Sequence, residues 1–311
     1  MTGHPQTQHP EMLLLDGTAM LFRAFFSGYR VQSVGGVEVG AVVMVTRQLQ
    51  GIVTRQRPDR VAVLFDPGHR TFRHEIDTSY KAQRPSSPKE LYPQFDLVQV
   101  AAVQLGLACF CVRGFEADDL MATMAMMARG GGYKTRLVTA DKDIYQLVCD
   151  EAPPIVQEDP KTGRRFTESA VRRRVGVLPS QMVDYLSLVG DSCDNIPGIR
   201  GIGPKTAVAL LEHFGSLDAI YDNLDKLTDL PLRGSSGLAR KLEAGQKDAL
   251  KARSLVVLRR DVELGLTAEE VFNVTRWLGP RGHTADRFFG RLGEPGALRR
   301  MRRAADVWFA A

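Results

Sequence analysis

The stretch Thr135–Asp143, TRLVTADKD, sets the pattern for the first half of the chain: a short apolar and β-branched run that ends at acidic residues. Such a run is typical of a buried strand, and each is followed by a helical pattern, as βαβ units require. Three earlier runs have the same pattern. The four runs, each with the acid that follows it, are Met12–Leu15 with Asp16, Val61–Phe65 with Asp66, Ala108–Val112 with Glu116, and Thr135–Ala140 with Asp141.

This alternation predicts an α/β fold with a mostly parallel central sheet and helices on both faces. Ligands of such sheets bind at the carboxyl ends of the strands, so four strands are expected to deliver an acid to one edge. Residues 151–167 are rich in proline and glycine and predict a short hairpin around DPKTG. From about Pro179 onward the pattern is helical, which predicts a domain boundary near residue 178.

Composition and charge narrow the class of protein. The 311 residues include 41 Lys and Arg against 36 Asp and Glu, and 44% are hydrophobic, which excludes wholesale disorder. No apolar run approaches the ~18 residues that cross a bilayer, so no membrane contact is expected. Four cysteines without zinc-site spacing favour a reducing cytoplasm over a disulfide framework. Residues 281–311 hold seven arginines and three acids, a weak indication of a polyanionic partner.

Carboxylates dominate the candidate site. EADD and GDSCDN add further acids to those that follow the strands. A helix cap or a solvated surface position explains any one of them, but so many like charges at one edge would repel unless Mg²⁺ or Mn²⁺ neutralised them. Two such ions about 3.5–4 Å apart are the usual apparatus for phosphodiester cleavage. The nine candidate metal ligands are Asp16, Asp66, Glu116, Asp118, Asp119, Asp141, Asp143, Asp191 and Asp194.

A glycine-rich segment, IPGIRGIGPKTA, follows directly after the last two acids. Its glycines permit a tight turn and close backbone approach, and Pro204 suits the first turn of a helix over Lys205–Phe214. The free amides at that helix start would grip phosphate without regard to sequence. A plain helix–helix turn explains the glycines as well, but their place beside the acids favours DNA binding. The candidate DNA-binding residues here are Gly198, Gly201, Gly203, Lys205 and Thr206.

Six motifs occur in a fixed order: FDPGHRTFRHE, SYKAQRP, EADDL, TADKD, GDSCDNIPGIRGIGPKTA and LRRDVEL. Together they resemble the 5′-nuclease family, which includes the 5′→3′ exonuclease domain of bacterial DNA polymerase I and stand-alone flap endonucleases. The resemblance covers nearly the whole chain, to about Met301. Because this length leaves no room for a polymerase domain, a free-standing member is expected.

The resemblance implies a particular domain order. A PIN-like nuclease domain is expected at 11–178, with a helical gateway near 80–98, and a helix–three-turn–helix domain at 179–275. Residues 1–10 form a polar extension. The basic segment 276–311 is expected to pack back on the nuclease domain, with Trp308 and Phe309 in the packing.

The resemblance also implies roles for single residues. Asp16, Asp66, Glu116, Asp118 and Asp119 would form a tighter metal site, and Asp141, Asp143, Asp191 and Asp194 a second one. Lys81 and Arg84 in the gateway would contact the scissile phosphate and stabilise its developing charge. Tyr80 would stack on a terminal base or simply pack, and Arg23 would touch phosphate or stay solvated. The glycine hairpin would hold duplex DNA, often with a K⁺ ion.

The implied function is that of a structure-specific 5′→3′ exonuclease and 5′-flap endonuclease, acting on DNA with two Mg²⁺ or Mn²⁺ ions in replication or repair. A monomer on the cytoplasmic nucleoid is expected, and no motif for a protein partner stands out. Two alternatives stay open. A PIN-type ribonuclease shares the acidic edge, although the glycine hairpin speaks against it. A catalytically silent junction-binding protein is the other, and the complete acid set opposes it.

Overall fold

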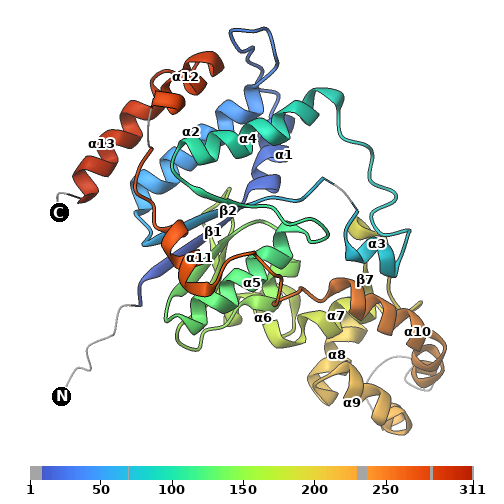
Figure 1. The fold of residues 1–311 in the computed structure, drawn as a ribbon. Helices are drawn as coiled ribbons and strands as arrows, with labels where there is room; N and C mark the ends of the chain where they lie inside the picture. Colours follow the sequence, from blue (N-terminus) through green and yellow to red (C-terminus); the bar gives the residue numbers. More distant parts are fainter. Residues whose placement is uncertain (1–8, 69, 230–236, 281–282, 310–311) are drawn as a thin grey trace, which may run out of the picture.

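The computed structural model describes residues 9–68, 70–229, 237–280 and 283–309 (Figure 1). Most of the polar extension expected at 1–10 lies outside these residues. The side chains of Trp308 and Phe309 also lie outside what the structure describes, so their expected packing stays a prediction.

A six-stranded sheet forms the centre of the molecule, in the order β3-β2-β1-β4-β5-β6. All neighbouring strands are parallel except β5 and β6, which form the antiparallel hairpin expected around DPKTG. The α/β fold with a mostly parallel sheet is therefore confirmed, with strand ends within two residues of the predicted runs. The strands are β1 (Glu11–Asp16), β2 (Arg60–Leu64), β3 (Ala108–Phe110), β4 (Lys134–Val138), β5 (Ile155–Glu158) and β6 (Arg165–Phe166).

Both faces of the sheet are buried, which explains why its central strands are uninterrupted apolar runs. Successive side chains of β1 point to opposite faces. Leu13 and Leu15 pack into the core on one side, and Met12 and Leu14 pack into the core on the other. A continuous apolar run thus supplies two separate cores at once.

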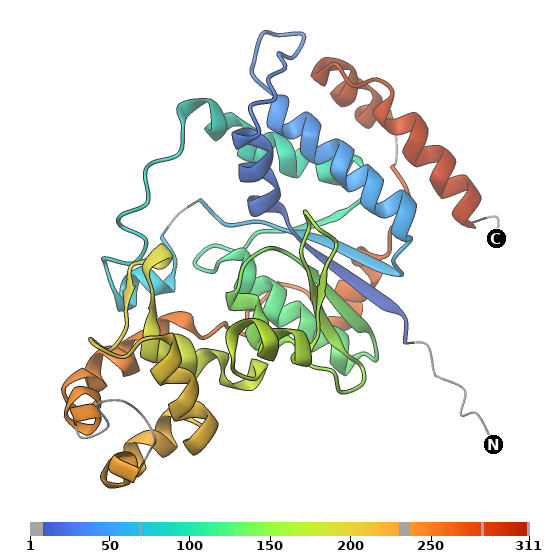
Figure 2. The same cartoon turned by 180° about the vertical axis from the view of Figure 1, so that it is seen from behind.

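Helices cover the two faces (Figures 1 and 2). The first core is closed by α1, α2 and α4, with α12 and α13 packed outside them, and the second by α5 and α11. The helices are α1 (Gly17–Phe26), α2 (Gly40–Gln56), α4 (Tyr92–Gln104), α5 (Ala117–Gly130), α11 (Ala268–Thr275), α12 (His283–Leu292) and α13 (Ala297–Phe309).

The second domain is helical and has its own core. Its last helix ends at Val256, and Leu258, Val262 and Val271 beyond it pack in the core under the sheet. Its elements, with the connecting ones, are η2 (Asp143–Leu147), α6 (Glu168–Val175), η3 (Pro179–Gln181), α7 (Met182–Val189), β7 (Gly190–Asp191), η4 (Ser192–Asp194), β8 (Ile196–Pro197), α8 (Pro204–Phe214), α9 (Leu217–Asp222), η5 (Leu224–Asp229) and α10 (Leu238–Val256).

The gateway differs from the expected helical segment near 80–98. Helix occurs at α3 (Phe72–Ile76) and again from η1 (Lys89–Leu91) into α4, whereas residues 77–88 form turns. Pro85 and Pro88 lack the backbone N–H that a helix needs, which accounts for the interruption. The turn carries Lys81 and Arg84 toward the carboxyl edge of the sheet.

Candidate metal and nucleic-acid site

Backbone contacts at the strand ends fix the first carboxylates. Asp16 ends β1 and caps α1, since its Oδ1 accepts from the Ala19 amide at 2.8 Å. Asp66 follows β2, and its Oδ1 accepts from the Ala117 amide at 2.7 Å. That amide lies at the start of α5, the helix that carries Glu116, Asp118 and Asp119 at its N-terminus. Two strands and one helix start are thus joined at the edge where acids were expected.

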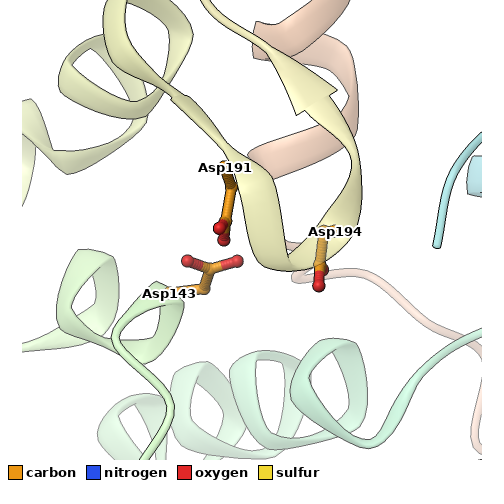
Figure 3. A group of neighbouring side chains, drawn as sticks. All are labelled: Asp143, Asp191 and Asp194. Atoms are coloured by element: carbon orange, nitrogen blue, oxygen red, sulfur yellow. The ribbon is translucent and has the colours of Figure 1, made fainter. Parts of the chain in front are cut away.

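A second cluster forms where η2 meets η4. Asp143, Asp191 and Asp194 each offer a carboxylate oxygen, and these oxygens lie within 4.8 Å of one another (Figure 3). The Asp143 amide donates to Asp141 Oδ1 at 2.9 Å, which holds the fourth acid beside them. Residues about 50 positions apart in the sequence therefore meet in one group.

The charges of the two clusters act on one another. Burial raises the pKa of Asp118 well above its usual value, and the charges of Asp141, Asp16 and Asp66 raise it further. Burial and the neighbouring charges of Asp66 and Asp141 raise the pKa of Asp16 to about 6. Burial and the charges of Asp141, Asp191 and Asp194 raise the pKa of Asp143 to about 8. Acids of both clusters therefore repel one another, as expected for a metal site without its ions.

Two buried oxygens in this pocket have no hydrogen-bond partner: Asp118 Oδ1 and Asp143 Oδ1. A buried polar atom without a partner is costly, so such atoms call for a missing ligand. One belongs to each cluster, and both are carboxylate oxygens, the donors that hard divalent cations prefer. The residues present therefore fit a pair of divalent ions.

Asp119 is a correction to the expected ligand set. Arg73, which is 2% exposed, donates to both of its oxygens at 2.7 and 2.8 Å. The amides of Glu116 and Arg259 donate to the same two oxygens at 3.0 Å each. With four donors on a fully buried carboxylate, no lone pair is left for a metal ion. Asp119 instead holds the start of α5 in place, and eight carboxylates remain.

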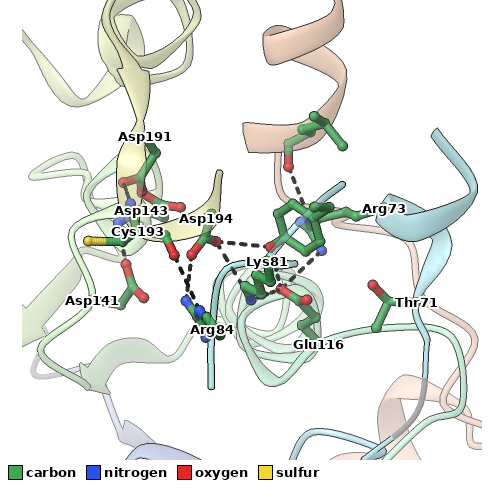
Figure 4. Close-up of polar contacts among 12 residues, drawn as sticks. Thr71, Arg73, Lys81, Arg84, Glu116, Asp141, Asp143, Asp191, Cys193 and Asp194 are labelled. Carbon is green, nitrogen blue, oxygen red and sulfur yellow. Dashed lines mark hydrogen bonds and ion pairs between the residues drawn. The ribbon is translucent and has the colours of Figure 1, made fainter. Parts of the chain in front are cut away.

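Arg73 is a functional residue that sequence reasoning missed (Figure 4). Besides binding Asp119, its Nε donates to the Leu255 carbonyl at 2.7 Å, and its Nη2 donates to the Val257 carbonyl at 3.3 Å. This side chain ties α3 to the start of α5 and to the end of α10. The only sequence signal was an arginine directly beside the gateway, in FRHE.

Lys81 and Arg84 lie in the pocket, as expected. Lys81 Nζ is 2.9 Å from Glu116 Oε2 and 3.6 Å from Asp194 Oδ2, and Arg84 Nη2 is 2.5 Å from Asp194 Oδ1. Lys142, which the sequence reasoning missed, pairs with Asp191 at 2.9 Å. Three cations against eight carboxylates still leave the pocket strongly negative.

For Tyr80 the structure favours one of the two expected alternatives. Its side chain is buried, at 3% exposure, and its hydroxyl lies 3.1 Å from Glu116 Oε2 and 3.0 Å from Asp194 Oδ2. Burial raises the pKa of Tyr80, which keeps it a proton donor. The ring therefore has no free face for a base in this conformation, and the packing alternative describes it.

The gateway turn is docked on the loop that carries Asp191 and Asp194. The Lys81 amide donates to the Asp194 carbonyl at 2.9 Å, and Gln83 Nε2 donates to the Ser192 carbonyl at 2.8 Å. Asn195 Nδ2 donates in return to the Ser79 carbonyl at 2.7 Å. Lys81 and Asn195 both have positive φ, 55° and 57°. Asparagine tolerates this conformation, which is the signal that could have marked Asn195.

The candidate DNA-binding residues have differing roles. Gly198 allows a close backbone approach, because a Cβ there would lie 2.2 Å from the Val189 carbonyl carbon, and Gly201 has φ +83°. Gly203 needs neither property. It precedes α8, whose N-terminus has no side-chain cap and exposes Lys205 while Thr206 is partly exposed.

Arg23 does not join the carboxylate pocket. It lies in the last turn of α1, partly exposed. Hydrogen bonds from the 160–162 turn lower the pKa of Asp159, and the charge of Arg23 adds to that effect.

Comparisons with known proteins agree with this architecture. The model "5'-3' exonuclease, N-terminal resolvase-like domain" matches residues 11–176, and "5'-3' exonuclease, C-terminal SAM fold" matches residues 177–277. DNA polymerase I of Pseudomonas aeruginosa is 37% identical over 263 residues, and that of Mycobacterium leprae is 36% identical over 266. Each alignment covers 84% of this chain but 28% of the relative, so the chain spans little more than a quarter of their length.

Solved structures share the fold. The phage T5 5′-exonuclease with divalent zinc ions bound has a TM-score of 0.66 at 22% identity, covering 91% of this chain and 98% of that one. Human GEN1 in complex with Holliday junction DNA has a TM-score of 0.64 at 13% identity, covering 96% and 73%. Within the described residues, no helix is long and apolar enough to cross a membrane. With both family models matching in order along residues 11–277, the chain belongs to the 5′-3′ exonuclease family.

Proposed function

We propose that this chain is a divalent-metal-dependent 5′→3′ exonuclease and 5′-flap endonuclease that hydrolyses DNA phosphodiesters. The observation that carries the proposal is the pair of carboxylate clusters, one around Asp118 and one of Asp143, Asp191 and Asp194, with the unpartnered buried oxygens of Asp118 and Asp143. A silent junction-binding protein would have no use for these oxygens, whose burial without a ligand costs stability. Membership of the family favours this activity over that of a PIN-type ribonuclease.

Two Mg²⁺ ions, or Mn²⁺, fit the donor set. Asp16, Asp66, Glu116 and Asp118 would hold one ion, and the second would lie among Asp141, Asp143, Asp191 and Asp194. When bound, such ions lower the pKa of a water nucleophile and stabilise the leaving oxygen. No histidine or serine nucleophile is then required, which agrees with a pocket built from carboxylates.

The cations of the chain bind and orient the substrate in this proposal. Lys81 and Arg84 now neutralise Glu116 and Asp194. Once metal ions carry that positive charge, both side chains can turn to the scissile phosphate, where their charge stabilises the transition state. The docked turn limits how far they can move, since the Lys81 backbone stays bonded to the Asp194 carbonyl. Tyr80 keeps its hydroxyl on the carboxylates and stays packed.

The helical domain holds the duplex. The uncapped N-terminus of α8, with Gly203, Lys205 and Thr206, suits a phosphate group. The K⁺ ion expected beside Gly198 and Gly201, the limits 11–178 and 179–275, the monomeric state and the nucleoid location stay predictions that depend on this function.

A double-flap DNA with a 5′ label tests the proposal by product mapping. The wild-type chain should cut near the flap junction with Mg²⁺ and not in EDTA, leaving a 5′-phosphate on the downstream strand. Asp118→Asn and Asp143→Asn should both abolish cleavage. Undiminished cleavage by both variants would remove the metal assignment, and a clear preference for an RNA flap of equal length would favour the ribonuclease alternative.

A further inference from the structure

A strongly basic surface lies outside the site described above, on the β5–β6 hairpin and α6. Between residues 159 and 175 the chain carries six cations and two acids. All six cationic side chains are exposed. This group, called here the hairpin–α6 surface, consists of Lys161, Arg164, Arg165, Arg172, Arg173 and Arg174.

The nearby acids are already engaged. Asp159 accepts from the amides of Lys161 and Thr162 at 2.9 and 2.8 Å, which shapes the hairpin turn. Glu158 accepts from Arg136 and Arg165 at 3.0 Å each. Glu168 accepts from the Asp150 amide at 3.1 Å. These bonds fix where the carboxylates lie but do not cancel their charges, and six cations against two acids between residues 159 and 175 still leave an excess of four positive charges.

Two of the arginines are held toward one point. The guanidinium carbons of Arg164 and Arg174 lie 5.0 and 5.6 Å from the centre of the Phe166 ring. Phe166 is buried and packs on Tyr145, with ring centres 5.1 Å apart. The face of the ring attracts each guanidinium, so both arginines are held beside Phe166 at the surface. Two exposed guanidinium groups held in this way can bind phosphate.

This surface continues from the metal pocket. Tyr145 belongs to η2, the same short helix that carries Asp143. Gln157 of β5 donates through Nε2 to the carbonyls of Thr139 and Asp141 at 2.9 and 2.8 Å, which fixes the hairpin to the acid loop. In Figure 2 the yellow-green hairpin stands beside the sheet and α6 lies below it, toward the helical domain.

We propose that the hairpin–α6 surface binds the phosphodiester backbone of the substrate's duplex DNA next to the second metal cluster, as a contact additional to that of the α8 N-terminus. The proposal rests on the function proposed above and adds a contact that neither the motifs nor the comparisons assign. Its ligand is a row of backbone phosphates read without base contacts, since arginine and lysine groups of this kind position DNA rather than specify sequence.

Salt-dependent binding tests it. The triple variant R172Q/R173Q/R174Q and the pair K161Q/R164Q are compared with wild type, using a fluorescein-labelled 5′-flap duplex in EDTA so that no cleavage occurs. A charge-matched control, R291Q/R299Q/R303Q, removes one exposed arginine from α12 and two from α13. Each phosphate contact contributes roughly 0.9 to the slope of log Kd against log salt concentration.

With one phosphate contact for each cation removed, the triple variant should lower that slope by about 2.7 and raise Kd at least about 10-fold, and the pair should lower the slope by about 1.8. The control should change the slope by much less, and kcat at saturating substrate with Mg²⁺ should stay near wild type in all three. Slopes equal to that of the control in both hairpin–α6 variants would overturn the proposal. Loss of cleavage by the wild-type chain would overturn the proposed function instead, while the binding slopes would still decide this surface. If the triple variant has a lower Tm than wild type, the slope of the pair K161Q/R164Q alone tests the proposal.

Discussion

Asp118 and Asp119 are neighbours in sequence but lie in opposite electrostatic environments, which makes a paired substitution informative. Asp119 is neutralised by Arg73 and by two backbone amides. Asp118 is surrounded by other acids, and one of its oxygens has no partner. We expect Asp119→Asn to destabilise the protein and Asp118→Asn to stabilise the metal-free form.

The loss of unfolding free energy expected for Asp119→Asn follows from the buried ion pair of Asp119 with Arg73. Removing one partner of a buried pair costs roughly 3–5 kcal/mol, and here Arg73 would keep only the longer contact to Glu116 at 3.5 Å. The asparagine oxygen keeps part of the hydrogen bonding, so a value near the lower end, about 3 kcal/mol, is expected. The double variant R73M/D119N should regain part of the loss seen in Arg73→Met, because neither charge is then buried alone.

Replacing Asp118 with Asn is expected to change the free energy of unfolding in the opposite direction. Its pKa is raised in the folded state, so the folded protein holds a proton that the unfolded chain releases above about pH 4. At pH 8 the metal-free fold therefore carries an electrostatic cost, worth about 1.4 kcal/mol for each pKa unit, which asparagine removes. Asp118→Asn should gain at least about 1 kcal/mol of unfolding free energy in EDTA.

Urea denaturation at pH 8, with EDTA and with Mg²⁺, measures both effects. Mg²⁺ at about 100 times its Kd should add about 2.7 kcal/mol to wild type. It should add nearly as much to Asp119→Asn and much less to Asp118→Asn. If the two variants shift the midpoint in the same direction in EDTA, or if Asp119→Asn alone loses the Mg²⁺ effect, the assignment of Asp119 as a positioning residue is wrong.

Three further predictions concern the same pocket. Asp16 and Asp143 should destabilise the metal-free wild type increasingly as pH rises from about 5 to 8, because both pKa values are raised in the folded protein, and Mg²⁺ should lessen this loss. Thermal melts across this pH range, with EDTA and with Mg²⁺, check it. Asn195→Gly keeps the positive φ but loses the bond to the Ser79 carbonyl, so kcat should fall about 5-fold with little change in KM, and an unchanged kcat would show that the docked turn is irrelevant. Lys81→Ala should lower kcat by about 100-fold or more, and single-turnover rates that match wild type would contradict its role at the phosphate.

Sequence patterns predicted the sheet well, because each buried parallel strand must be a short apolar run and each run ended at an acid. The hairpin around DPKTG and the helix starting at Pro204 were also confirmed, since proline and glycine fix local geometry. The gateway was less predictable. Its turn is stabilised by bonds to the Asp194 loop, which lies more than 100 residues away in the sequence.

At the site, too, local sequence pattern predicted some features and long-range packing decided others. Spacing could place the carboxylates at one edge, but it could not tell Asp118 from Asp119, because the difference is the buried Arg73 that reaches Asp119 from the gateway. Burial likewise decided between the two alternatives for Tyr80. Lys142 lies between two expected ligands, yet its bond to Asp191 depends on how η2 meets η4. Local pattern thus gives the residue types at the site, and long-range packing gives their roles.

The central claim is that one pocket of eight carboxylates binds a pair of divalent ions. Anomalous diffraction from crystals soaked in Mn²⁺ tests it most directly. We predict two peaks, one among Asp16, Asp66 and Asp118 and one among Asp143, Asp191 and Asp194, with Asp119 bonded only to Arg73 and the backbone. An absence of manganese from the pocket at concentrations that support cleavage, or a peak bound by Asp119, would contradict the account.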